Sequence, residues 1–470
     1  MAASPSPLRR VAVIGGGITG AAAAFEASLH LPNGSASTTL DSVVLFESGP
    51  AIGGRTRSTA FAGLDHVDAG PDAFLARVPD ATALAAQVGL TNDLVHPNRV
   101  GAAVWHHALH DIPEGLVLGV PGNPLSLARS PLLSWRGKAR AALEPFLPRT
   151  STEPDSIGEF IRARFGNEVH ERLVDALVGS IYATDTDRFS LSEMPQLAAL
   201  TSSRSLLLAA RKTAAKGTAS ASAAPIFAAP RSGLHTLVTA TADAAEANGV
   251  RTLVDTPGDV TRGPGSTWLV DGQTFDDVII ATPAGAAHSI LEPVAPGSAA
   301  ALSSAETSDV VLLSFHIDAR EWPERLSGRS GYLVPKPVQH DVTAVSFGSQ
   351  KWAHWQPPAG GEILRVSLGR DGAPILHLDD DEIVERALAD LSRHLDTSFA
   401  PCEVRVSRWP GAFAQYRPHH RRWVESVRRE LPAGLHVAGS SYDGIGIPAC
   451  VKSGRTIAQH AATRSLTLPE

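Results

Sequence analysis

Three glycines near the start of the chain have the spacing of a nucleotide-binding turn. Gly15, Gly17 and Gly20 follow the apolar segment 10–14 and precede an alanine-rich segment, so the order is strand, glycine loop, helix. In such a turn the first glycine makes the bend, the second lets the backbone approach a pyrophosphate, and the third allows close packing of helix and strand. Free N–H groups at the helix N-terminus attract phosphate oxygens. The spacing therefore predicts a dinucleotide site.

A second apolar segment, SVVLFE, ends in an acidic residue, Glu47. An acid at this position holds the ribose hydroxyls of the adenosine, and a glutamate in place of an arginine disfavours NADP. The polar segment PNGSASTTLD explains the long interval between Gly20 and Glu47 as an insertion. A structural turn without a ligand is the alternative, but strand, helix and acid together favour nucleotide binding.

Another glycine loop, GSSYDGIGIP, lies near the end of the chain and leads into a predicted helix. Pro448 suits the first position of that helix. A dinucleotide is extended, so the first loop can hold its phosphates while its redox ring needs separate support. The free N–H groups of 449–451 would face the edge of a flavin where negative charge develops on reduction. The two loops together favour a flavin cofactor.

Composition favours a globular protein with two or three lobes, since 470 residues exceed one ordinary core. The net charge of −7 argues against nucleic-acid or anionic-membrane binding. Cys402 and Cys450 lack the spacing of a disulfide framework or a structural zinc site. No apolar run is long enough to span a bilayer, and RRVAVIGGG suits a first strand better than an export signal. We therefore expect a cytoplasmic location.

Patterns along the chain separate a helix-rich middle from strand-rich flanks. Residues 127–208 are predicted to be helical, with Ser156 as an N-cap. The segment AAVWHHALHDIP is predicted to form a hairpin, and DVVLLSFHI, TAVSFGS and EILRVSLG alternate like strands of a second sheet. The segment DDDEIVERALADLSRHL is predicted to be a capped helix, and the low-complexity segment 212–230 a loop.

Several segments resemble the FAD-dependent protoporphyrinogen/coproporphyrinogen oxidases of haem synthesis, in particular their soluble bacterial branch. The segments are GGGITGAAAAFE, GGRTRS, AGPDAFLARVP, LHDIPEGLVLGVP, SIGEFIRARFGNEVHERLVDALVGSIYATDTDRFSL, PRSGLHTL and GSSYDGIGIPACVKSGR. The likeness runs from Val11 to Ile457. Its central helical motif and its last glycine loop are more distinctive than the first glycine loop.

The resemblance implies an α/β plus α+β fold with three domains. These are a discontinuous Rossmann-like FAD-binding domain (1–64, 231–292 and 405–470), a mixed-sheet substrate-binding domain (65–95 and 293–404) and a helical domain (96–205), with a loop or linker at 206–230.

It also implies contacts with a non-covalently bound FAD. The residues carried over by motif position are Gly15, Gly16, Gly17, Ile18, Thr19, Gly20, Glu47, Ser48, Arg55, Gly70, Pro71, Asp72, Ala73, Gly258, Trp409, Ile447, Pro448 and Ala449. Gly258 stands where the family has a valine that pairs with adenine, and Val260 is the alternative. A solvated surface role is the alternative for Arg55. Cys450 is expected to be a buried small side chain and no site of covalent attachment.

On the substrate side, the resemblance places the carbonyl of Gly331 beside the reacting ring and packs Leu333 on the macrocycle; a turn glycine and a core leucine are the alternatives. The substrate arginine of some relatives falls near Gly101 here, so Arg77, Arg99 and Lys336 become the candidates for binding propionates. The implied reaction passes a hydride from a porphyrinogen to the flavin and then electrons to O2, forming H2O2. A ferrochelatase-like acceptor for the product is left open.

Coproporphyrinogen III is the expected substrate and protoporphyrinogen IX the alternative, since the former keeps four propionates and needs no bilayer. A flavin amine oxidase would need an aromatic pair before the flavin, and the last loop holds only Tyr442. A non-catalytic flavin or tetrapyrrole carrier is disfavoured by the two complete glycine loops. His106, His107 and His110 have metal-like spacing, but a strand would split them between its faces, so no metal is expected.

Overall fold

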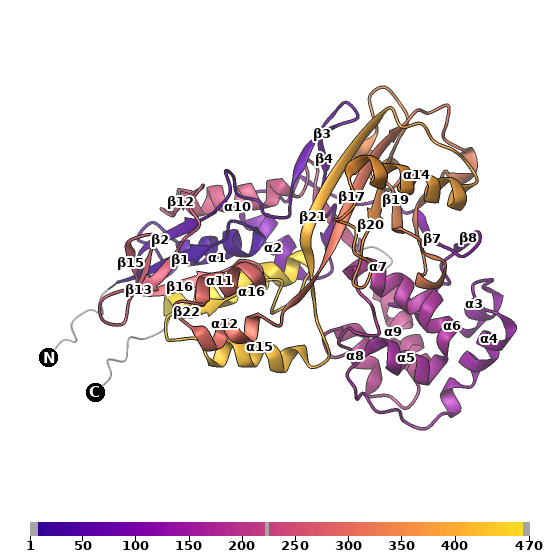
Figure 1. Ribbon diagram of the computed structural model, residues 1–470, viewed down its shortest axis with the longest axis horizontal. Coiled ribbons are helices and arrows are strands. Elements are labelled where there is room, and N and C mark those ends of the chain that lie inside the picture. The colour runs from indigo at the N-terminus through magenta and orange to yellow at the C-terminus, as the bar shows by residue number, and fades with distance from the viewer. Residues whose placement is uncertain (1–7, 221–224, 464–470) are drawn as a thin grey trace.

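The computed structural model describes residues 8–220 and 225–463, and these form an elongated molecule of mixed α/β structure (Figure 1). We name three parts by their secondary structure: a parallel-sheet lobe, a seven-stranded sheet and a helical lobe. In Figure 1 the parallel-sheet lobe lies on the left, and the helical lobe lies below the seven-stranded sheet on the right.

Five parallel strands form the centre of the parallel-sheet lobe. Their spatial order is β12 (Arg251–Leu253), β2 (Leu40–Phe46), β1 (Arg9–Ile14), β16 (Asp277–Ile280) and β22 (Leu435–Val437). Side chains of β1 alternate between two cores, with Val11 and Val13 in one and Ala12 and Ile14 in the other. This sheet is therefore buried on both faces, as parallel sheets usually are.

Helices cover both faces of the parallel sheet. One face packs against α1 (Ile18–Ser28), α2 (Pro79–Gln87), α10 (His235–Ala247) and α16 (Ile447–Thr463). The other face packs against α11 (Ala284–Leu291), α12 (Pro296–Leu302), α15 (His420–Arg429) and a small sheet of β13 (Val260–Arg262), β14 (Trp268–Val270) and β15 (Gln273–Phe275).

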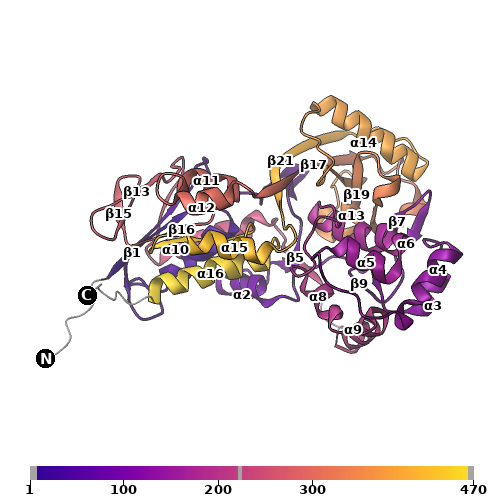
Figure 2. The same cartoon turned by 60° about the horizontal axis from the view of Figure 1, so that its bottom comes forward.

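A mixed sheet of seven strands forms the second part. Its order is β21 (Glu403–Gln415), β17 (Glu306–Ile317), β20 (Glu362–Leu368), β19 (Val342–Phe347), β18 (Arg329–Leu333), β7 (Gly101–Trp105) and β8 (Leu109–Asp111). Leu313, Phe315 and Val366 lie on one face, in a core shared with α14 (Asp380–Leu395). Figure 2 shows α14 on the side of the sheet that faces away from the helical lobe. The predicted hairpin, strands and capped helix of this region are confirmed.

The helical lobe has its own apolar core. Its helices are α3 (Pro124–Arg129), α4 (Trp135–Ala142), α5 (Ile157–Phe165), α6 (Asn167–Val169), the wider π-helical segment η2 (His170–Gly179), α7 (Ser180–Tyr182), α8 (Pro195–Thr201) and α9 (Leu206–Ser220). Ser156 Oγ accepts the N–H of Glu159 at 3.3 Å, so the predicted N-cap of α5 is confirmed. Within the described residues, no helix has both the length and the apolar character needed to cross a membrane.

Short strands and one short helix connect these parts. They are β3 (Ser58–Phe61), β4 (Leu64–Asp68), β5 (Phe74–Leu75), β6 (Leu94–Val95), β9 (Leu116–Val117), β10 (Val120–Pro121), β11 (Phe227–Pro230) and α13 (Gly348–Lys351).

Three of the expected domain boundaries differ from the observed architecture. The helical domain is predicted to include 101–111, but these residues form β7 and β8 of the seven-stranded sheet. The FAD domain is predicted to begin at 405, but β21 continues through Gln415 and pairs with β17. Segment 65–95 is assigned to the substrate domain, yet Phe74 and Leu84 lie in the core of the parallel-sheet lobe. Each difference arises from a pairing between distant segments that local patterns do not encode.

The linker predicted over 206–230 begins as a helix and ends as a strand. Helix α9 extends to Ser220, β11 begins at Phe227, and residues 221–224 lie outside the described part. Alanine, lysine and arginine favour the helical state. The buried carboxylate of Glu144 also accepts the N–H groups of Leu206 at 2.8 Å and Leu207 at 3.3 Å, which stabilises the N-terminus of α9.

Candidate active site

The topology brings both glycine loops to one edge of the parallel sheet. Strands β1, β2, β16 and β22 run in the same direction, so the segments that follow them meet at their carboxyl ends. A Cβ built on Gly439, which follows β22, would lie 3.1 Å from Thr19 Oγ1 at the start of α1. Ligands of open α/β sheets bind at this edge.

The first glycine loop combines tight packing with one open position. Gly15 has a φ of +107°, a conformation that favours glycine. A Cβ on Gly20 would overlap with the carbonyl oxygen of Gly15, whereas no described atom lies within 4 Å of a Cβ built on Gly17. Gly17 is also the N-cap of α1 and supplies no side-chain cap, so the N–H groups of the first turn are left for a ligand.

Glu47 stands at the end of β2, against this loop. Its Oε2 accepts the N–H of Gly16 at 2.7 Å, and its Oε1 accepts the N–H of Gly49 at 2.7 Å. The exposed Ser48 donates to Oε1 at 3.3 Å. Gly258 lies beside them, because a Cβ there would lie 3.2 Å from Ile14 in β1. Its alternative, Val260, is buried within β13.

Arg55 links the parallel-sheet lobe to two other segments. The preceding loop rests on the first glycine loop, where Gly53 donates its N–H to the carbonyl of Gly16 at 2.9 Å. The Arg55 side chain is half-buried and donates to the carbonyl of Gly411 at 2.6 Å and to Ser440 Oγ at 3.5 Å. Burial lowers the pKa of its guanidinium.

The C-terminal loop is fixed by a tyrosine that the sequence did not single out. Tyr416 Oη donates to the carbonyl of Ser440 at 2.7 Å and accepts the N–H of Gly444 at 2.8 Å. Gly446 is exposed, and a Cβ there would meet only Pro448 Cδ, at 3.8 Å. The loop therefore has a rigid base and an accessible tip at the start of α16.

Three of the predicted cofactor contacts lie near that tip. Ile447 and Ala449 are half-buried and Pro448 is buried at the N-terminus of α16. Cys450, which follows them, is buried, and burial raises the pKa of its thiol to about 11. A thiol in this state is a poor nucleophile, which fits a packing role.

Residues 70–73 lie between the parallel-sheet lobe and the seven-stranded sheet. Gly70 is buried, and no described group accepts its N–H. Trp409 Nε1 donates to the carbonyl of Ala69 at 2.9 Å. Pro71 is exposed and Ala73 half-buried.

The side chain of Asp72 points to the seven-stranded sheet. It pairs with Lys351 at 2.8 Å and Arg365 at 3.4 Å, and it accepts from Trp352 Nε1 at 3.1 Å. Burial alone would raise its pKa, but these cations hold it well below the ordinary range. Its carboxylate is therefore occupied by protein groups, which leaves its backbone for a cofactor.

Gly331 and Leu333 lie in β18, in the interior of the seven-stranded sheet. Gly331 is buried with a φ of +133°, and a Cβ there would overlap with the carbonyl of Val345, so only glycine fits. Leu333 is half-buried and pairs with Ala344. Both belong to the face opposite α14. On that face the half-exposed residues are Leu312, Leu333, Ala344, Ser346, Ser367, Ser407 and Trp409, together with Ala102, His110, His316 and Arg405.

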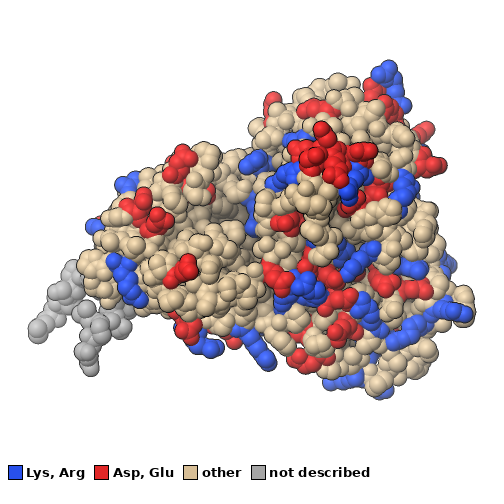
Figure 3. Space-filling model, viewed as in Figure 1, with Lys and Arg blue, Asp and Glu red and all other residues tan. Residues whose placement is uncertain are grey.

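The three candidate propionate ligands differ in their surroundings. Arg77 and Arg99 are exposed, and neither forms an ion pair with a described residue. Lys336 follows β18 and pairs with Asp185 of the helical lobe at 2.6 Å. Figure 3 shows Lys and Arg interspersed with Asp and Glu on one face, mainly over the seven-stranded sheet and the helical lobe.

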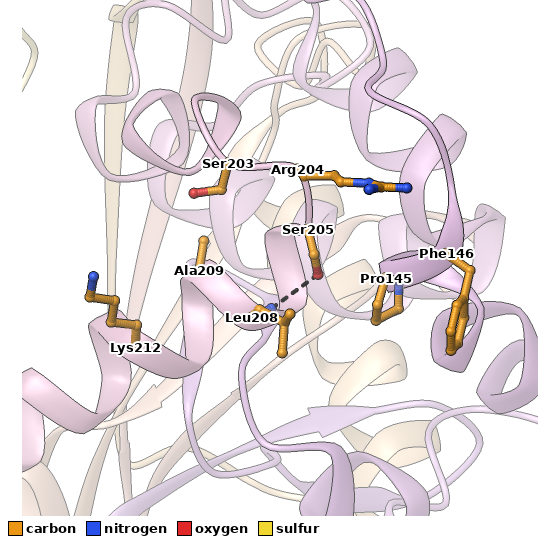
Figure 4. A pocket seen from close by; sticks show the side chains of 8 residues that line it. All are labelled: Pro145, Phe146, Ser203, Arg204, Ser205, Leu208, Ala209 and Lys212. Carbon is orange, nitrogen blue, oxygen red and sulfur yellow. Dashed lines mark hydrogen bonds between the residues drawn. The ribbon is translucent and has the colours of Figure 1, made fainter.

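Two other features lie apart from these residues. Within the described ranges no set of three metal-ligating side chains could hold an ion, and the rings of His106 and His107 pack together with their centroids 4.7 Å apart. The helical lobe also carries a pocket of about 580 Å³ (Figure 4). It is lined by Pro145, Phe146, Ser203, Arg204, Ser205, Leu208, Ala209 and Lys212, none of which is a predicted site residue.

Comparison with known proteins defines the class. Residues 31–462 match the family of flavin-containing amine oxidoreductases. A putrescine oxidase structure superimposes with a TM-score of 0.66 at 17% identity, over 98% of this chain and all of that one, which shows the shared fold.

Proteins of higher sequence identity show which family within this class the chain belongs to. The chain is 31% identical to coproporphyrinogen III oxidase of Bacillus subtilis (strain 168), over 97% of this chain and 98% of that protein. It is 32% identical to coproporphyrinogen III oxidase of Mycobacterium leprae (strain TN), over 96% and 97%. A crystal structure from Exiguobacterium sp. 255-15, provisionally named a protoporphyrinogen oxidase, superimposes with a TM-score of 0.83 at 27% identity, over 97% and 98%. The chain therefore belongs to the FAD-dependent coproporphyrinogen III/protoporphyrinogen IX oxidase family.

The protein is thus an FAD-dependent oxidoreductase, and its residues fit that cofactor. Gly17 has open space at its Cβ position, the carboxylate of Glu47 lies against the first glycine loop, and the buried N–H of Gly70 lacks an acceptor among the described groups. The exposed Gly446 leaves space at the C-terminal loop.

Proposed function

We propose that this protein oxidises coproporphyrinogen III to coproporphyrin III, with O2 as the electron acceptor and H2O2 as the by-product. FAD, when bound, accepts hydride from the macrocycle and delivers electrons to oxygen. The relatives named for coproporphyrinogen III oxidation match nearly the whole chain and support this choice. A cytoplasmic location and transfer of the product to a ferrochelatase-like enzyme remain predictions.

The observation that carries the proposal is the half-exposed face of the seven-stranded sheet. Its side chains are mostly small and uncharged, for example Ala344, Ser346, Ser367 and Ser407. A broad, puckered macrocycle can rest on these small side chains, because the guanidinium groups of Arg365 and Arg405 on the same face are already bound to backbone carbonyl groups of 67–70. Pockets of this kind use apolar contact area for affinity and few polar groups for orientation.

Within this proposal, each part of the site has a distinct role. Gly331 and Leu333 would contact the macrocycle, and the two glycine loops would hold FAD non-covalently at the adjoining edge of the parallel-sheet lobe. A buried Cys450 with a raised pKa favours non-covalent binding, because its thiolate is scarce at neutral pH.

Substrate carboxylates would be met at the margin of the face. Lys336 is the best placed candidate, because it follows β18 just beyond Leu333. In the absence of substrate its charge is balanced by Asp185. Arg77 and Arg99 are exposed and free of described ion pairs, so each can turn toward an anionic group.

The test compares two porphyrinogens, prepared anaerobically and exposed to air with the FAD-loaded enzyme. We expect kcat/KM for coproporphyrinogen III to exceed that for protoporphyrinogen IX by roughly tenfold, since one additional charge-assisted hydrogen bond gives about that factor. Putrescine serves as the control for amine oxidation and should not be turned over. A preference for protoporphyrinogen IX would overturn the choice of substrate, and turnover of putrescine alone would overturn the reaction class.

A further inference from the structure

One register row crosses five neighbouring strands of the seven-stranded sheet. Residues directly opposite one another in a sheet share a face, so all members of this row point away from α14. In strand order the row consists of Gly331, Ser346, Arg365, Ser314 and Arg405. It begins at the predicted substrate contact in β18, and its two arginines reach segment 67–72 of the parallel-sheet lobe.

The far end of this row holds four consecutive carbonyl groups, those of residues 67–70. Arg405 donates to the first and the second, at 3.1 Å each. Trp409, four residues further along β21, donates to the third at 2.9 Å. Arg365 Nη2 donates to the fourth. A backbone segment of one lobe is therefore oriented by side chains of another.

Fixing these carbonyl groups also fixes the N–H groups that follow them. In a trans peptide the C=O and the next N–H point in opposite directions. Because the carbonyl of Ala69 faces Trp409, the N–H of Gly70 faces away from the sheet. Gly70 is buried and no described group accepts this N–H, which marks it as a donor to a ligand.

The same side chains concentrate positive charge behind this segment. Three cations, Lys351, Arg365 and Arg405, face the buried Asp68 and the half-buried Asp72, whereas the third carboxylate near Arg405, that of Glu403, belongs to an exposed residue. Arg365 is only 7% exposed, so solvent screens its charge weakly. Burial, with the neighbouring Arg365 as the next cause, lowers the pKa of Arg405 to about 10, so it stays charged at neutral pH.

We propose that Arg365, Arg405 and Trp409 are positioning residues that fix the cofactor-facing segment 67–70, and that the two guanidinium groups raise the reduction potential of the bound FAD. Reduced flavin carries negative charge, and preorganised positive charge in a dry site stabilises it. The proposal rests on the proposed contact between Gly70 and FAD. If so, the seven-stranded sheet has two roles: it contacts the substrate, and it sets how readily the flavin accepts hydride.

The experiment measures the midpoint potential of FAD in the holoenzyme, by dye equilibration without any porphyrinogen. Arg365→Met and Arg405→Met should each bind FAD with a more negative midpoint potential than the wild type. Arg365→Lys, which keeps the charge but loses the hydrogen-bond geometry, should recover most of that shift. Trp409→Phe should weaken FAD binding while moving the potential little, because it removes a positioning bond without removing charge.

Arg329→Met is the matched control, since Arg329 begins β18 and pairs with the exposed Asp111. Its potential should equal that of the wild type. The proposal fails if the methionine variants retain the wild-type potential while only their unfolding temperatures fall, which is the result of a purely structural role. Should they fail to fold, Arg365→Gln and Arg405→Gln replace them, because glutamine keeps a hydrogen-bond donor while removing the charge, and potentials equal to the wild type in both variants exclude the charge effect. Since no porphyrinogen is used, the result is independent of the substrate assay.

Discussion

At the residue scale, Glu47 shows how one carboxylate can organise a cofactor site before the cofactor binds. Its two oxygens each accept a backbone N–H at 2.7 Å, from Gly16 and Gly49, and so join the first glycine loop to the loop after β2. An ionised carboxylate has about four acceptor positions, so it can still accept ribose hydroxyls. Glu47, which the sequence predicts to be a ribose ligand, thus also holds two loops together.

Glu47→Arg should therefore weaken FAD binding by roughly 10- to 100-fold, the factor expected for one or two charge-assisted hydrogen bonds. The replacement removes both acceptors and places a cation beside the N–H groups of Gly16 and Gly49. Fluorescence titration of the apoprotein with FAD measures the change, and Asp41→Asn on the same strand provides the control. An unchanged dissociation constant in the Glu47 variant would exclude it as a ribose ligand.

At the element scale, two glycines, one just before α16 and one within it, have opposite roles. Gly454 crosses α1 so closely that a Cβ would overlap with the carbonyl of Thr19. Gly446, just before the helix, has open surroundings. One glycine is required by helix packing, and the other leaves space where the flavin ring is proposed to bind.

Gly446→Val should abolish turnover while leaving the unfolding temperature of the apoprotein within a few degrees of the wild type. The physical reason is that the added side chain meets only Pro448 within the protein but would occupy the place of the ring. Gly454→Val, the matched variant, should lower the unfolding temperature strongly because its side chain meets the α1 backbone. Circular dichroism and oxygen consumption measure the two effects. Normal turnover by Gly446→Val would remove this loop from the active site.

Local sequence patterns predicted the helices and strands well, but they did not predict which distant segments contact one another. The hairpin of β7 and β8 and the helix α14 follow from residue alternation and capping, which are encoded within a few residues. The contacts of Arg365 with Gly70 and of Arg405 with Val67 span 295 and 338 residues. Neither arginine differs in its local sequence from a surface arginine, so only the fold reveals them.

At the scale of the whole molecule, a buried ion pair joins the helical lobe to the seven-stranded sheet. Arg370, after β20, pairs with Asp175 in η2 at 2.9 Å. Thr186 donates to Asp175 at 2.7 Å and lies 2.8 Å from His170 Nε2. This network connects the helical lobe to the seven-stranded sheet, so the predicted substrate face and the helices beside it form one cooperative unit.

Buried histidines should make the folded protein less stable in mild acid. Burial lowers the pKa of His170 and His420 to about 4, from an ordinary value near 6.5. Between these pH values the unfolded chain binds protons that the folded chain does not, so stability falls as pH decreases through this window. Burial raises the pKa of Asp68 to about 6 and also raises the pKa of Glu193 and Glu362, and these groups act in the opposite direction. They oppose four histidines, because burial also lowers the pKa of His354 and His394 to about 4.

We therefore expect the unfolding temperature of the apoprotein to be clearly lower at pH 5 than at pH 7. His420 stacks between Tyr416 and Trp423, with ring centroids 3.8 Å and 5.1 Å away, so His420→Phe keeps an aromatic ring in the stack while removing the titrating group. That variant should show a smaller difference between the two pH values, measured by circular dichroism at constant ionic strength. His30→Phe, at a half-buried position after α1, should keep the wild-type difference. An equal pH dependence in wild type and His420→Phe would show that the buried imidazole does not contribute to the acid sensitivity.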